Sequence, residues 1–139
     1  ILKASTQYDF IVLGTHGATN ILQRLLGSVS ETVASKAICP VFLVPCDVQF
    51  YKPNNLIILQ SGNIDLTNKI SDTFPKCHNI NMGDDDVEML QNFLEREDVF
   101  FLMNRQDFNK IFEIIPNSKF KKYYELILQY KKPLVIWAD

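Results

Sequence analysis

The 139-residue sequence lacks several features that would point to a membrane or secreted protein. No apolar run approaches the length of about 20 residues that a membrane-spanning helix needs, and no basic-then-apolar leader opens the chain. Cysteine is scarce: Cys39, Cys46 and Cys77 are odd in number and form no CxxC pair. This excludes a disulfide framework or zinc site of ordinary spacing. These absences predict a cytoplasmic protein that does not enter a membrane.

The sequence also has little excess charge of either sign. Its 14 Lys and Arg residues are nearly balanced by 16 Asp and Glu residues, which gives a formal net charge of -2. The longest basic cluster (Lys119, Lys121 and Lys122) is small and is typical of a solvated helix face. We therefore expect no nucleic-acid partner, because such partners require a dense positive surface. With 47% hydrophobic residues, the chain can still bury a core.

Short apolar runs alternate with segments that have helical periodicity. Such runs are typical of strands buried on both faces of a parallel sheet. The predicted strands are 10–13, 41–44, 56–59, 79–82, 99–103 and 134–137, and the predicted helices include 28–37, 65–74, 87–96, 106–115 and 119–130. This alternation predicts an α/β fold with a mainly parallel sheet flanked by helices.

The two ends of the chain resemble each other. Residues 9–13 match residues 98–102, and the Pro-led strand 40–44 matches 133–137. Held in that register, the glycines of the first copy fall opposite other residue types: Gly14 opposite Met103, Gly17 opposite Gln106, and Gly27 opposite Pro116. The second copy is thus predicted to keep the strands and helices but to have lost the glycines.

The first copy contains three glycines at a suggestive spacing, Gly14, Gly17 and Gly27, followed by Ser28. Gly14 permits a sharp turn off the strand, and Gly17 permits close approach of backbone to a ligand. The segment from Gly27 to Ser30 presents free backbone N–H groups and hydroxyls at a helix start, which suits a phosphate. Alternatively, the glycines serve only a tight turn and a helix C-cap. Their position between two buried strands favours the nucleotide loop.

With this pattern, Asp9 to Val44 closely resembles the carboxy-terminal half of the universal stress protein domain, whose ATP-binding branch shares Gly-x2-Gly-x9-Gly-Ser/Thr. The resemblance implies a Rossmann-like fold of the adenine nucleotide alpha hydrolase-like type. It implies a site for ATP or a related adenine nucleotide, with magnesium as a companion. The implied nucleotide-binding residues are Leu13, Gly14, Gly17, Gly27, Ser28, Val29 and Ser30.

The resemblance also predicts the domain organisation. Residues 1–48 are expected to be the carboxy-terminal half of domain one, 49–55 a linker, and 56–139 a degenerate, shortened second domain of a tandem protein. The family uses an Asp after its first strand, and that strand of domain one would precede Ile1. We therefore expect the chain to be a piece of a longer protein, in which the nucleotide site can be empty.

Other candidate residues do not assemble into a site. His16 lies in the loop at a variable position, and His78 beside Cys77 has no further ligand at metal-binding spacing. The acidic run 84–86 lacks the alternating pattern of a calcium loop and suits the start of a helix. No nucleophile, base and acid can be grouped, so we predict no catalytic residue and no metal site.

Three functions remain open. The leading hypothesis is a stress-response protein whose first domain binds an adenine nucleotide as a regulatory or protective module. The second is a module without nucleotide that dimerises or assembles through its last strands, 41–44 and 134–137. The third is a slow ATPase, for which no base or magnesium ligand is visible.

Overall fold

The computed structural model describes residues 6–14, 28–45, 54–59, 70, 72, 78–82, 87–111 and 119–137. The strands are β1 (Ile11–Gly14), β2 (Val41–Val44), β3 (Asn55–Leu59), β4 (His78–Met82), β5 (Val99–Asn104) and β6 (Leu134–Trp137). The helices are α1 (Ser28–Lys36), α3 (Val87–Leu94), α4 (Arg105–Ile111) and α5 (Lys119–Gln129). The predicted strands are confirmed to within a residue at each end, because apolar runs bounded by Pro, Gly and polar residues define them.

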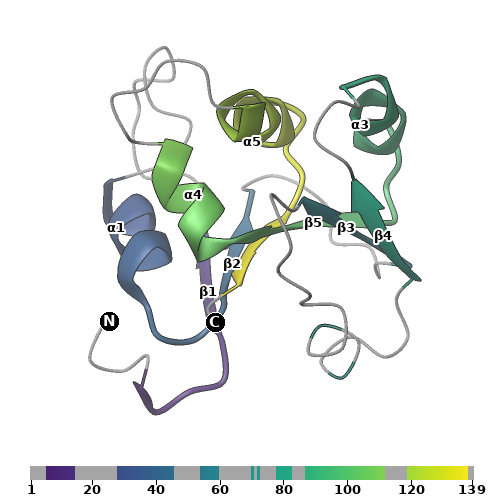
Figure 1. Ribbon diagram of the computed structural model, residues 1–139. Coiled ribbons are helices and arrows are strands. Elements are labelled where there is room, and N and C mark those ends of the chain that lie inside the picture. The colour runs from purple at the N-terminus through teal and green to yellow at the C-terminus, as the bar shows by residue number, and fades with distance from the viewer. Residues whose placement is uncertain are drawn as a thin grey trace.

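All six strands form one sheet in the order β1-β2-β6-β5-β3-β4 (Figure 1). Every neighbouring pair is parallel except β2 with β6, which is antiparallel. The predicted fold class is confirmed: the chain is a Rossmann-like α/β protein with a mainly parallel sheet. In the part of the chain that the structure describes, no helix is long and apolar enough to cross a membrane.

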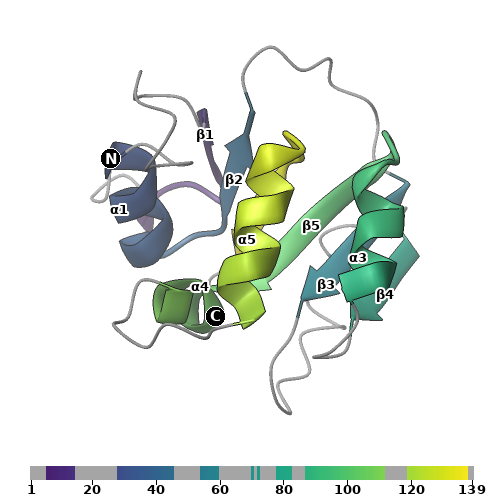
Figure 2. The same ribbon diagram turned by 90° about the horizontal axis from the view of Figure 1, so that it is seen from above.

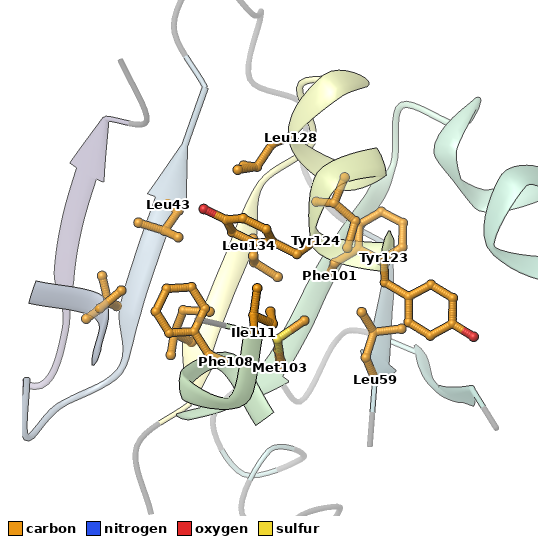
Figure 3. Close-up of a cluster of buried hydrophobic side chains, with 14 of the residues drawn as sticks. Leu43, Leu59, Phe101, Met103, Phe108, Ile111, Tyr123, Tyr124, Leu128 and Leu134 are labelled. Atoms are coloured by element: carbon orange, nitrogen blue, oxygen red, sulfur yellow. The ribbon is translucent and has the colours of Figure 1, made fainter. Parts of the chain in front are cut away.

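The described helices α1, α3, α4 and α5 lie over one face of the sheet (Figure 2). Their apolar sides and that face of the strands form the larger core (Figure 3). Tyr123 and Tyr124 on α5 point in different directions there, toward Leu59 of β3 and toward Leu43 of β2. The opposite face carries a smaller core made of Leu56, Ile58, Ile70, Phe100, Leu102, Val135 and Trp137. The strands are therefore apolar on both sides, as continuous runs require.

The two Pro-led strands, β2 and β6, meet in the middle of the sheet. Val41 pairs with Ile136 and Leu43 with Leu134 in antiparallel register. Each strand also has a parallel neighbour on its other side, so both edges of β2 and of β6 are occupied within the chain. A strand of the first copy thus packs directly on a strand of the second copy. Whether the protein also dimerises through these strands stays a prediction.

The internal repeat is visible in the backbone hydrogen bonds, but its register differs from the predicted one. Ile11 N donates to Pro40 O over 3.0 Å, and Phe101 N donates to Pro133 O over 3.1 Å. Ile11 therefore corresponds to Phe101, and the predicted register was wrong by one residue. Strand faces alternate, so a slip of one residue exchanges core and solvent sides. The aspartates that begin the two matching segments were a weaker guide than strand pairing.

With the register corrected, the exposure of β1 can be compared with that of β5. Phe10 and Val12 of the first copy correspond to Phe100 and Leu102 of the second. Val12 is 66% exposed, whereas Leu102 is fully buried. β5 lies between β3 and β6, but β1 is at the end of the described sheet and has only β2 beside it. Phe10 contacts the ring of Phe42 edge-on at 5.2 Å, which covers part of the same face.

Polar side chains tie together the amino-terminal ends of β3 and β5. Asp98 Oδ2 accepts a hydrogen bond from Asn55 Nδ2 at 3.2 Å, and Arg96 binds the same carboxylate through Nε and Nη2 at 3.2 and 3.1 Å. The Lys132 ammonium donates to the Arg96 carbonyl. The hydrogen bond from Arg96, ahead of their charge attraction, holds the pKa of Asp98 below its ordinary value.

Candidate functional site

The predicted phosphate loop begins at the carboxyl end of β1. Gly14 is the last residue of that strand, pairs with Val44 of β2, and is exposed. Leu13 is partly buried, and its side chain packs against the helix-side core.

The other side of the predicted loop is the first turn of α1. Ser28 opens the helix, Val29 is 62% exposed, and Ser30 is buried. The first N–H groups of a helix have no partner inside it, and the helix dipole adds positive potential there. Glu31 in this first turn also suits the positive end of the helix. This turn therefore has the backbone donors that an anion site needs.

A hydrogen bond joins these two sides. Ser30 Oγ donates to Gly14 O over 2.8 Å, linking the end of β1 to the start of α1. The structure thus brings Gly14, Val29 and Ser30 to one edge of the sheet. Gly17 and Gly27 lie outside the described residues, and their predicted roles stay predictions.

The matching place in the second copy is built differently. In the corrected register Asn104, not Met103, corresponds to Gly14. Asn104 is buried, and its Oδ1 accepts a hydrogen bond from Gln106 N over 2.7 Å. α4 starts immediately afterwards at Arg105, whereas residues 15–27 separate β1 from α1. The second copy has a capped helix start where the first has a glycine.

Asp107, near the start of α4, is buried at 4% exposure and lies one turn from the end of β5. Sequence reasoning missed Asn104 because the register was shifted. An Asn directly before a helix is an N-cap signal that could have identified Asn104.

The remaining candidates give no second site. Across the described ranges, no group of three or more His, Cys, Asp or Glu side chains is placed to hold a metal ion. His16, Cys77 and the acidic run 84–86 lie outside those ranges, while His78 begins β4. The cluster of Arg96, Asp98 and Asn55 is already paired internally and serves the strand ends.

Comparison with known proteins shows which family the first part of the chain is similar to. The profile of the Universal stress protein family matches residues 1–45. The curated protein Universal stress protein MJ0577 from Methanocaldococcus jannaschii is 50% identical over 36 residues. Residues 1–45 of the chain are therefore similar to the universal stress protein family. The identical stretch is 26% of this chain and 22% of that relative.

Solved structures support the fold of the whole chain. A functionally unknown protein, PA1789 from Pseudomonas aeruginosa PAO1, superposes with a TM-score of 0.54 at 10% identity. A protein from Pseudomonas aeruginosa UCBPP-PA14, provisionally described as a universal stress protein, gives 0.54 at 12% identity. Each alignment covers 99% of this chain and 66% of the other. The chain thus spans just under two thirds of these structures, and the likeness concerns the fold alone.

Proposed function

We propose that this universal stress protein binds ATP or a related adenine nucleotide, with magnesium, at the carboxyl end of β1. The nucleotide acts as a regulatory or protective ligand and not as a substrate. We place this role in the cytoplasm, in line with the scarcity of cysteine. The single observation that carries the proposal is the placement of the first turn of α1 against Gly14, held by Ser30.

Three features support this proposal. The glycine pattern that the family's ATP-binding branch shares lies between β1 and α1. The exposed Gly14 and the start of α1 lie at the same edge of the sheet. The equivalent edge of the second copy carries Asn104, whose side chain caps α4. The proposal therefore assigns one nucleotide to the chain, in the first copy.

The proposal is tested by isothermal titration calorimetry of the 139-residue protein with ATP and magnesium. Binding with a stoichiometry near one is expected. Gly17→Val and Gly27→Val are expected to abolish it, because a branched side chain blocks close approach of the backbone to phosphate. Lys121→Ala, an exposed change on α5, is the matched control and should bind like wild type. Absent binding, or binding that both glycine variants retain, contradicts the proposal.

One observation favours assembly as a second function. β1 ends the described sheet, and Tyr8, Phe10 and Val12 are exposed at this edge. Exposed strand edges with apolar side chains are common sites of strand pairing with another chain. A dimer remains a proposal, and sedimentation equilibrium tests it. If Val12→Lys leaves a measured dimer intact, the edge of β1 is not its interface.

A further inference from the structure

The hydroxyl of Ser30 is the polar side-chain group that connects the two sides of the proposed nucleotide site. Ser30 is 9% exposed on the third residue of α1, and its Oγ lies 2.8 Å from Gly14 O. A serine hydroxyl has one proton, and a carbonyl oxygen is only an acceptor. The Ser30 proton is therefore committed to Gly14. What remains on Oγ are lone pairs, which do not attract a phosphate oxygen.

This geometry changes the role expected for Ser30. The family resemblance places Ser30 among the residues that hold the phosphates. The hydrogen bond instead fixes the end of β1 relative to the first turn of α1. Gly14 is itself fixed laterally by pairing with Val44 of β2. The contact thus sets the distance between the end of β1 and the start of α1. The nucleoside is expected near the first of these points and the phosphates near the second.

The second copy offers an internal comparison. Ala37 N donates to Val33 O in the first copy, and Tyr130 N donates to Leu126 O in the second. In the register of these equivalent helix ends, Ser30 corresponds to Tyr123, a buried side chain of the helix-side core that points toward Leu59 (Figure 3). The Ser–Gly pair therefore occurs in the copy that has the glycine pattern. In the other copy the same two positions hold Tyr123 and Asn104.

We propose that Ser30 is a positioning residue: it holds the Gly14 carbonyl against α1, fixes the spacing between the nucleoside and phosphate regions, and does not bind phosphate. This inference rests on the proposed nucleotide binding. It separates Ser30 from the backbone amides of the same turn, which remain the phosphate donors. The two roles predict different losses of affinity when the hydroxyl is removed. A ligand role predicts a loss that grows with the number of phosphates on the nucleotide, whereas a positioning role predicts the same loss for each nucleotide.

The test is calorimetry of wild type, Ser30→Ala and Ser30→Thr with AMP, ADP and ATP, each with magnesium. Ser30→Ala is expected to weaken all three by a similar factor of at most about five, the limit set by the free energy of one ordinary hydrogen bond. Ser30→Thr keeps the hydroxyl and should restore most of the affinity for each nucleotide. A loss that grows from AMP to ATP identifies Ser30 as a phosphate ligand and overturns the inference.

A nuclear magnetic resonance measurement makes the test independent of folding losses. The carbonyl carbon resonance of Gly14 reports the hydrogen bond directly, so it should shift in Ser30→Ala and return toward its wild-type position in Ser30→Thr. If wild type binds nucleotide and Ser30→Ala binds AMP, ADP and ATP as tightly as wild type does, positioning is refuted and the proposed function stands. If wild type binds none of them, the proposed function fails and the inference fails with it.

Discussion

The difference between the two ends of the sheet leads to a prediction with an internal control. Val12 on β1 and Val135 on β6 have the same side chain and lie on the same face of the sheet. Val12 is 66% exposed and Val135 is 0% exposed. Truncation of each to alanine is the same chemical change in two environments. The difference between the two costs therefore reports how much better the sheet covers Val135 than Val12.

The expected magnitudes follow from the buried groups. Valine to alanine removes two methyl groups, each worth about 0.8 kcal/mol when fully buried, and a rigid core adds a cavity cost. Val135→Ala should therefore lower the free energy of unfolding by about 2 to 3 kcal/mol. Val12→Ala should cost about 0.5 kcal/mol, because only a third of the side chain is covered. The two midpoints of thermal unfolding should differ by roughly 6–10 °C.

Urea unfolding followed by tryptophan fluorescence measures this difference. The sequence has a single tryptophan, Trp137, which lies in the same small core as Val135. Its emission therefore reports on the face that is being tested, and far-ultraviolet circular dichroism checks that the transition is two-state. Equal losses in Val12→Ala and Val135→Ala would refute the reasoning, because they would mean that β1 is as well covered as β6.

Two further predictions concern pH. The hydrogen bond from Arg96 lowers the pKa of Asp98 in the folded chain. The ionised Asp98 therefore stabilises the fold fully above its unfolded pKa of 3.8, and this stabilisation is lost as pH falls through the folded pKa. Asp98→Ala should cost about 1 kcal/mol at pH 7 in urea unfolding and less at pH 2, and a constant cost would contradict this. Burial of Tyr124 raises its pKa, and the nearby negative charge of Glu31 raises it further. Just above pH 10, therefore, this phenol ionises only in the unfolded chain. Stability should therefore fall above pH 10 in wild type and fall less in Tyr124→Phe, as thermal unfolding would reveal.

Most of the fold could be predicted because its signals are local. The apolar runs at β2 and β6, each preceded by proline, determine both strands without tertiary information. Helix α1 was predictable from Ser28 and the acidic Glu31 at its start. Strand order was not predicted beyond the packing of the two copies, because it depends on contacts between segments far apart in the sequence.

The register of the repeat shows why local signals fail. Matching Asp9 to Asp98 is reasonable by sequence, yet in the structure Asp98 lies at the position of Tyr8. Asp98 is held by Arg96 and Asn55, a set of contacts that no single-residue match can reveal. The direction of the Ser30 hydroxyl is also a tertiary property. A serine in the first turn of a helix can face a ligand or a neighbouring strand, and sequence does not distinguish the two.

The central claim is that a nucleotide binds the first copy in this chain, at Gly14 and the start of α1. The most direct measurement is a titration of the ¹⁵N-labelled protein with ATP and magnesium, followed by amide resonances. We predict saturable shifts at Gly14, Val29 and Ser30, with Asn104 and Asp107 unchanged. Shifts confined to Asn104 and Asp107, or no saturable shift at Gly14, Val29 and Ser30, would contradict the account.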